Sequence, residues 1–390
     1  MADSVGAVLR SSERHDHRDM EEHLLKPPRL FRSLFNAALL ATTMAAGAQT
    51  APSDQTKPGE DENLLAKQQR SPWLLVPLIS SNPKLGTSIG GMAGYIKRFD
   101  QVSEPSLFAL QATISNTSSK VLGLGGKLYF NENHDRATVG LVGGKVSNDY
   151  LDFLGSGQEV STDEQMRAFF LRYQHEVAPH WYLGVQGVHS NYNVDGVDPT
   201  SELILDEADI TGLVSSGLGA VLAYDSRDNV NNPTGGVYAL LHNVAYRESL
   251  GSDADYDALI AELRWYLHTE DSNVLVLHAK GRWTADAPSS RESTIEMRGY
   301  NRGQYLGRHM AMLEAEDRYQ IGQHWGAKGF GGVACLYGDD KSCAMEALYP
   351  MIGVGAFYII KPKEHMVVNA EFAKGKAANQ GFYLRFGNRF

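Results

Sequence analysis

The sequence lacks any long hydrophobic run. Across its 390 residues, no window approaches the roughly 20 consecutive apolar residues that a membrane-spanning helix needs. The mean hydropathy of −0.30 agrees, and together these features exclude a polytopic helical membrane protein. Positive charge is also scarce, because 36 Lys and Arg stand against 46 Asp and Glu and the net charge is −10. We therefore expect no nucleic-acid partner, since such proteins need a basic surface.

The residue patterns of catalysis and metal binding are missing as well. The 13 His show no metal-ligand spacing, and no nucleophile elbow, phosphate loop or paired-carboxylate context occurs. We expect no catalytic residues, no metal site and no cofactor, and we expect that the protein is not an enzyme. Glycine, in contrast, is abundant, since 39 of the 390 residues are Gly and the usual share is about 7%. It lies inside alternating segments, which indicates many strands and turns.

The N-terminal region contains the three parts of a secretory signal peptide. They are a basic stretch, an apolar stretch and an A-x-A cleavage pattern, at residues 26–32, 34–46 and 46–48. Residues 1–19 fit no such peptide, so translation from Met20 instead of Met1 would leave a signal of normal length. We assign residues 1–48 to an N-terminal extension and signal peptide and predict Sec-type export. The alternative is a short amphipathic helix on a cytosolic protein.

A polar stretch and then one repeated kind of element follow. Residues 49–71 are rich in Pro, Gly and acids and predict a flexible periplasmic linker. From Pro72 to Phe390, segments of about 10–14 residues alternate apolar and polar positions, which is the period of strands. We count sixteen such segments, at roughly 72–80, 86–98, 105–115, 119–130, 136–146, 165–175, 180–192, 210–224, 234–247, 255–268, 272–284, 309–320, 324–337, 349–360, 365–374 and 381–390.

The length of these segments separates two all-β architectures. Strands of soluble sandwiches average about 5–6 residues, whereas a tilted strand needs about 9–11 residues to cross a bilayer. The segments are of the longer kind, with Trp and Tyr near their ends. We predict an all-β fold: a single transmembrane antiparallel β-barrel of about 16 strands over residues 72–390. Its connections sort into a short set and a long set, the long ones being 148–164, 193–210, 285–308 and 338–348.

Two motifs lie within this pattern. The first is a turn with Asp225, Arg227 and Asp228, followed by Pro233 and Gly235; the second is Arg298-Gly299-Tyr300 in the longest connection, followed by Glu314 and Glu316. Together they resemble the bacterial surface antigen family, the BamA/TamA-like outer-membrane barrels. In that family a D-x-R-D…P-x-G turn precedes a strand that enters the membrane, and an R-G-F/Y loop folds into the lumen. The resemblance covers about residues 72–390, with eleven strands before the loop and five after it.

The resemblance assigns roles to the loop and its acids. It implies that Arg298 pairs with Glu316 inside the lumen; Glu314 shares the face of Glu316 by the period-2 rule and is a second candidate. A confined arginine needs a carboxylate, and its planar fork suits bidentate pairing. Gly299 permits a tight turn, and Tyr300 can wedge against the wall. An exposed loop arginine near unrelated acids is the alternative.

The sequence departs from the family in two places. Gly332 stands where the family often has a second acid, so the loop would be anchored more weakly or held by Glu314. Family members that insert other proteins also carry periplasmic POTRA domains, and the linker is too short for one. This departure puts the substrate-delivery role in doubt.

Two further features concern folding and assembly. Cys335 and Cys343 bracket an external connection in an oxidising compartment, which allows either a disulfide or two free thiols. The C-terminal Phe390 is a candidate assembly signal or an aromatic girdle residue.

The sequence thus predicts a bacterial outer-membrane barrel that acts in protein or lipid insertion or translocation. A passive channel or structural surface barrel is the second hypothesis, and a secreted soluble β-rich hydrolase is the third. Expected partners are outer-membrane lipids, the barrel-assembly machinery for its own insertion, and a periplasmic partner chain.

Overall fold

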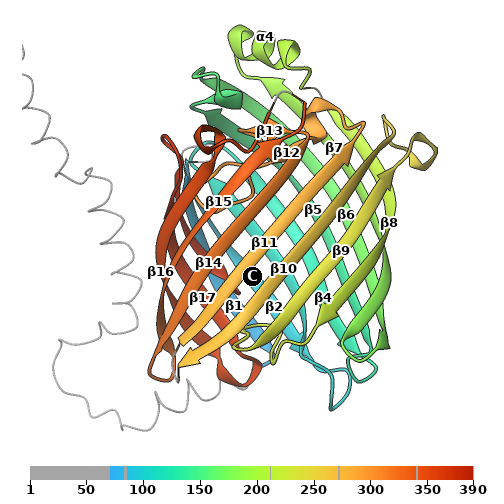
Figure 1. Cartoon of the computed structure of the whole chain (residues 1–390), viewed down its shortest axis with the longest axis vertical. Coiled ribbons are helices and arrows are strands. Elements are labelled where there is room, and N and C mark those ends of the chain that lie inside the picture. The colour runs from blue at the N-terminus through green and yellow to red at the C-terminus, as the bar shows by residue number, and fades with distance from the viewer. Residues whose placement is uncertain (1–70, 83–85, 211, 271–272, 340, 390) are drawn as a thin grey trace, which may run out of the picture. The chain divides into compact units, whose positions relative to one another are not determined.

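Sixteen strands close into one antiparallel barrel (Figure 1). The computed structural model describes residues 71–82, 86–210, 212–270, 273–339 and 341–389. The predictions for the extension, the signal peptide, the linker up to residue 70 and Phe390 lie outside these residues. The barrel strands are β1 (Trp73–Asn82), β2 (Gly86–Lys97), β3 (Ser106–Ser115), β4 (Lys120–Phe130), β5 (Asp135–Tyr150), β6 (Val160–Ala178), β7 (Trp181–Gly196), β8 (Leu213–Asp225), β9 (Gly236–Tyr246), β10 (Tyr256–Glu270), β11 (Asn273–Ala285), β14 (His309–Ile321), β15 (Trp325–Tyr337), β16 (Tyr349–Lys361), β17 (Met366–Lys374) and β18 (Gln380–Phe386).

Each strand pairs with its neighbour in the chain, β11 pairs with β14, and β18 closes the ring on β1. This confirms the predicted all-β antiparallel barrel and its strand number. Eleven barrel strands precede the connection between β11 and β14, and five follow it, which is the predicted division.

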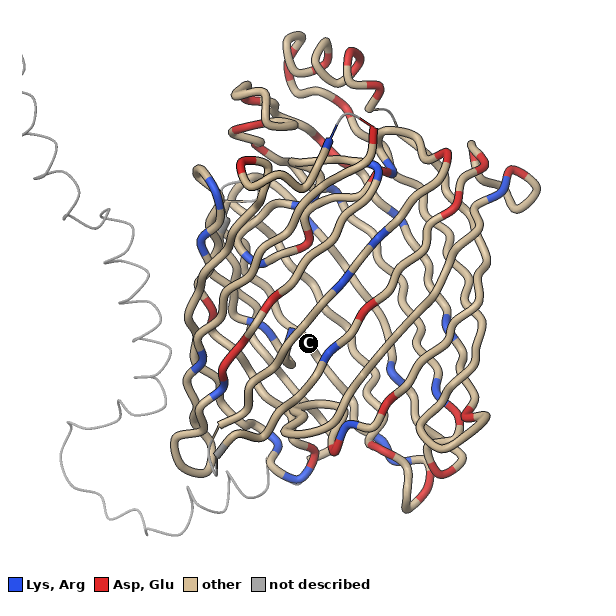
Figure 2. Tube along the Cα trace, in the orientation of Figure 1, with Lys and Arg blue, Asp and Glu red and all other residues tan. Residues whose placement is uncertain are grey.

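The two faces of the wall differ in chemistry. In β4, the outward Leu122 and Leu124 are 56% and 52% exposed, whereas acids and bases such as Glu316, Arg318 and Glu371 are buried. Apolar side chains therefore cover the outside and polar side chains line the inside, which is the arrangement that a lipid surround requires. Figure 2 shows that Lys, Arg, Asp and Glu occur along the strands as well as in the connections.

The connections lie at two rims of opposite character. The long ones share one rim with the helix α4 (Pro199–Glu207) and the 3-10 turn η1 (Phe153–Gly155), and the short ones form the other (Figure 1). The sequence did not predict α4, which lies inside a long connection. Asp198 caps it by accepting from the amides of Thr200 and Ser201, and Pro199 begins it. None of the described helices has the length and hydropathy to cross a membrane.

Strands β5 to β7 are longer than the sequence pattern predicts. Their extensions carry Tyr150 and Val160, which pack with Phe153 and with Leu205 of α4 in one apolar cluster. Packing between separate connections thus extends these strands beyond the rim of the long connections. The periodicity of a single segment contains no information about such packing.

The seam between the first and last strands has few backbone pairs. Residues 79–81 of β1 pair with residues 382–384 of β18 in three pairs, whereas β1 and β2 share ten. Nearer the short-turn rim, Leu74 and Val76 pack with Met366 and Phe386 in an apolar cluster. Side-chain packing continues the contact there. After β18, Gly387 adopts a φ of +75° and its amide donates to Val367.

Candidate functional site

The connection between β11 and β14 forms a closed loop. It contains η3 (Ser289–Arg291), and the short strands β12 (Ser293–Thr294) and β13 (Leu306–Gly307) pair with each other at its base. Gly299, at the loop's turn, has a φ of +83°, a backbone conformation that glycine adopts without strain. The loop from Ile295 to Tyr305 carries the predicted motif, and we call it the arginine loop.

Arg298 is fully buried among three carboxylates. Its Nη1 lies 2.5 Å from Glu316 Oε2 and 3.4 Å from Glu371 Oε1, and its Nε lies 3.8 Å from Glu314 Oε1. Its guanidinium carbon lies 3.3 Å from the centroid of the Phe330 ring. The structure therefore brings Arg298 together with both predicted acids and with a third carboxylate, that of Glu371.

Further cations surround the same carboxylates. Five ion pairs extend the network: Arg318 with Glu316 at 2.7 Å, Lys328 with Glu371 at 2.5 Å and with Glu316 at 3.8 Å, Arg385 with Glu371 at 2.8 Å, and Arg389 with Glu314 at 3.7 Å. These residues come from β14, β15, β17 and β18 and from the chain after β18. Buried charges are tolerated where each has several partners, and every carboxylate here lies between at least two cations.

His278 joins this network to a second one. Its Nδ1 lies 3.2 Å from Glu314 and its Nε2 lies 2.7 Å from Glu262, which in turn pairs with Arg264 at 2.7 Å. The imidazole is 4% exposed, and it bridges the buried Glu314 and the part-buried Glu262, which lie on the two strands that flank β11.

Tyr300 and Gly299 attach the arginine loop to the wall. The Gly299 amide donates to the Tyr383 hydroxyl at 3.1 Å. The Tyr300 hydroxyl donates to the Pro350 carbonyl at 2.6 Å and accepts from the Lys376 amide at 2.8 Å. The Tyr300 ring also packs edge-on against Tyr305 and Tyr349.

The turn motif lies at the short-turn rim. Asp225 accepts from Arg136 at 2.6 Å and from Arg227 at 2.7 Å. Asp228 accepts from the Thr234 amide and hydroxyl, and its own amide donates to the Gly235 carbonyl. Pro233, which lies between Asp228 and Gly235 in the chain, is buried. The motif residues thus hold one another, with Arg136 of β5 as an additional partner.

Cys335 and Cys343 form a disulfide with a Cα–Cα distance of 5.4 Å. It closes the connection between β15 and β16, in which Lys341 donates to the carbonyl of Leu306 in β13. The disulfide-closed connection therefore contacts the base of the arginine loop.

Sequence reasoning missed most of the cations and the third acid. Glu371 was visible only as a polar position in its segment, and nothing in one strand's period relates it to a loop 73 residues earlier. Gly332, which replaces an acid of the family pattern, has a clear role here. A Cβ at this position would lie 2.7 Å from the Leu313 carbonyl oxygen and 2.8 Å from Glu314 Cγ, so a larger residue would clash with both the backbone of β14 and the Glu314 side chain.

A sixteen-stranded barrel with an apolar outer face and a charged inner wall defines the class, a transmembrane β-barrel of the outer-membrane type. The family follows from sequence. Residues 98–331 match the model of the Omp85 superfamily domain, which is more than half of the chain, and the protein therefore belongs to the Omp85 superfamily. This confirms the resemblance to BamA/TamA-like barrels. It is consistent with the bacterial outer membrane and agrees with a non-enzymatic role.

Solved structures with this fold are distant in sequence. BamA from Haemophilus ducreyi lacking POTRA domains 1–3 has a TM-score of 0.53 and 12% identity, over 82% of this chain and 70% of that one. CdiB from Acinetobacter baumannii has a TM-score of 0.55 and 12% identity, over 81% of this chain and 60% of that one. No curated protein sequence matches the chain. At these identities the likeness supports the fold alone.

Proposed function

We propose that this barrel acts in the insertion or translocation of proteins or lipids at the outer membrane. The seam between β1 and β18 carries the proposal, because three residue pairs join these strands within the described part of the chain. A backbone hydrogen bond contributes about 0.5–1.5 kcal/mol net, so separating this seam costs less than separating the ten pairs of β1 and β2. An opened seam would offer unpaired strand edges to an incoming strand or lipid.

The same proposal includes a plugged lumen. The arginine loop reaches strands β14 to β18 through Arg298, Gly299 and Tyr300, which supports a plug that keeps the lumen shut while the seam works. The proposed partners are outer-membrane lipids, the assembly machinery that inserts the barrel itself, and a periplasmic chain that delivers clients. The chain spans 60% of the matched CdiB structure and 70% of the matched BamA structure, so the activities of those proteins are not carried over.

A seam-locking disulfide tests this proposal. Ser81→Cys with Phe382→Cys joins paired residues across the seam, and Ser81→Cys with Thr87→Cys joins paired residues of β1 and β2 as the matched control. The probes are a urea-unfolded eight-stranded barrel and a fluorescent phospholipid, each added to liposomes that contain the protein. We expect the oxidised seam variant alone to lose stimulation of both and to regain it with reductant. Wild-type rates in the oxidised seam variant would contradict the proposal.

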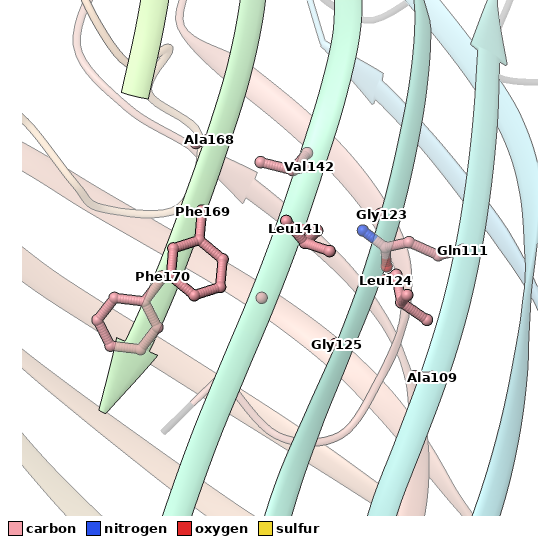
Figure 3. A pocket seen from close by; sticks show the side chains of 11 residues that line it. Ala109, Gln111, Gly123, Leu124, Gly125, Leu141, Val142, Ala168, Phe169 and Phe170 are labelled. Carbon is pink, nitrogen blue, oxygen red and sulfur yellow. The ribbon is translucent and has the colours of Figure 1, made fainter. Parts of the chain in front are cut away.

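A passive channel is the second candidate function, and one observation favours it. A cavity of about 320 Å³ lies along β3 to β6 (Figure 3), where the inner wall carries small or apolar residues such as Gly123, Gly140 and Val142. Planar bilayers discriminate between the two functions. Large, stable currents support the channel, whereas small flickering currents support a plugged barrel.

A further inference from the structure

A second group of charged side chains, contributed by residues that precede the arginine loop in the chain, lies on the inner wall. It contains five cations. They are Lys127 of β4, Arg136 of β5, Arg172 of β6, Arg227 of the turn after β8, and Arg264 of β10, and we call them the inner-wall cation cluster. Lys127 lies within electrostatic range of Arg227 and Arg264. The guanidinium carbons of Arg227 and Arg264 lie 4.5 Å and 5.3 Å from the centroid of one tyrosine ring, that of Tyr238.

The carboxylates beside this cluster are already engaged. Asp225 accepts from Arg136 and Arg227, and Glu262 accepts from Arg264 and contacts His278. Five cations against these two carboxylates leave an excess of three positive charges. Since the chain as a whole has a net charge of −10, this local excess runs against its composition.

The hydrogen bonds of three of these arginines use only one edge of each guanidinium. Arg172 directs Nε and Nη2 to one neutral acceptor, the Gln186 Oε1, at 3.0 Å and 2.7 Å. Arg227 and Arg264 likewise use the Nε and Nη2 edge for their carboxylates. Within the described residues, Lys127 makes no hydrogen bond or ion pair, although it shares the inward face of β4 with Tyr129, which lies beside Arg136.

The Arg172 fork is held in place by a second layer of contacts. The Gln186 amide nitrogen lies 2.8 Å from His242 Nδ1 and donates to the Asn243 carbonyl at 2.8 Å. These contacts fix the amide so that its oxygen faces Arg172. The guanidinium is therefore positioned before any ligand arrives, which lowers the entropy that binding would cost.

We propose that the inner-wall cation cluster binds a phosphate-bearing anion inside the barrel. Arginine forks and a lysine ammonium match phosphate oxygens in charge and geometry, and a confined lumen with low-dielectric walls strengthens their field. Arg136 is the second residue of β5, and Arg227 lies two residues after the end of β8, so the site lies toward the short-turn rim. A free phosphate compound and a phospholipid headgroup share this chemistry.

Calorimetry of the full barrel in neutral detergent tests the site, with inorganic pyrophosphate as the probe. The variant Lys127→Gln with Arg172→Gln removes two of the three excess charges, and we expect it to bind pyrophosphate at least about tenfold more weakly. Lys120→Gln with Arg167→Gln is the matched control, because these exposed cations lie on the same two strands but on the opposite face. We expect the control to bind within about twofold of wild type.

A second arm separates the two sources of phosphate. Native mass spectrometry compares retention of phosphatidylglycerol with that of phosphatidylcholine by the same proteins. If the wild type retains phosphatidylglycerol selectively and the double variant does not, the site binds a lipid headgroup. If the wild type binds pyrophosphate but shows no such lipid selectivity, the site binds a free anion. Absence of both, or equal losses in the control, overturns the proposal. Lys127→Gln alone, which breaks no hydrogen bond or ion pair within the described residues, serves if the double variant fails the heat-modifiable migration expected of a folded barrel.

Discussion

At the scale of the residue, Arg298 shows what an inward charge demands of its surroundings. Its side chain is 0% exposed and has carboxylates from three positions around it. Removing one partner of a buried ion pair leaves an uncompensated charge, which costs about 3–5 kcal/mol. We therefore expect the free energy of unfolding of the barrel to depend on Arg298.

Replacing Arg298 by a neutral residue of similar length tests this dependence. We expect Arg298→Met to lower the free energy of unfolding by about 3–5 kcal/mol, measured by urea titration in detergent micelles. Arg302→Met is the control, because that side chain is 74% exposed and we expect a change of under about 0.5 kcal/mol. Equal losses in the two variants would contradict a specific role for Arg298.

A charge swap between Arg298 and Glu316 is not an adequate test of their pairing. Glu316 also pairs with Arg318 and lies 3.8 Å from Lys328, so an arginine at its position would face two other cations. A double-mutant cycle with Arg298→Met and Glu316→Gln avoids this repulsion. We expect a coupling of about 1–3 kcal/mol between the two changes, and strictly additive losses would show that the contact contributes nothing.

Asp100, in the turn between β2 and β3, gives a prediction about pH. The Ser103 hydroxyl and amide, at 2.5 Å and 2.6 Å, lower the pKa of its carboxyl from 3.8 to about 2. Because the folded pKa lies below the unfolded one, the turn's stabilisation is present above pH 4 and is lost as the pH falls toward 2. We expect a carbon-13 titration of Asp100 to have its midpoint near pH 2, and Ser103→Ala to move it upward. A wild-type midpoint near the ordinary value would contradict this.

At the scale of the element, strands were predictable and their ends were not. The alternation around Leu259 and Leu263 indicates which side chains face outward, since a strand's faces follow from the period alone. The helix α4 and the extensions that carry Tyr150 and Val160 depend on contacts between separate connections. Single-strand patterns do not contain that information. The same limit hid Glu371, which contacts Arg298, and Lys328, which pairs with Glu371.

The connection between β15 and β16, at the rim of the long connections, is closed by a disulfide. Its disulfide joins residues with a sequence separation of 8, and the chain-entropy model gives such a closure about 2–3 kcal/mol. We expect Cys335→Ser with Cys343→Ser to speed tryptic cleavage after Lys341 by at least about tenfold. Cleavage after Arg247, in another connection at the same rim, is the internal control and should not change. Equal rates at Lys341 with and without the disulfide would show that it does not order the connection.

At the scale of the whole molecule, the barrel reverses the usual distribution of polarity, with apolar side chains outside and charges within. The same substitution should therefore have very different costs at neighbouring positions on one strand. We expect Leu141→Arg, on the outward face, to cost about 2–4 kcal/mol in a bilayer. Val142→Arg, which faces the cavity along β3 to β6, should cost much less. Refolding yields in liposomes, measured by heat-modifiable migration, check the pair, and equal losses would contradict the assigned faces.

The even number of antiparallel strands has a topological consequence. β1 begins and β18 ends at the same rim, because the two strands run in opposite directions across the seam. A short peptide linking Trp73 to Phe386 would therefore turn the seam into an ordinary hairpin, and the chain could be reopened in any connection at the opposite rim. Such a circular permutant would keep every strand pair, including the three pairs of β1 with β18, while moving the chain ends to another junction, so the effect of free chain ends could be measured separately from the effect of few backbone pairs.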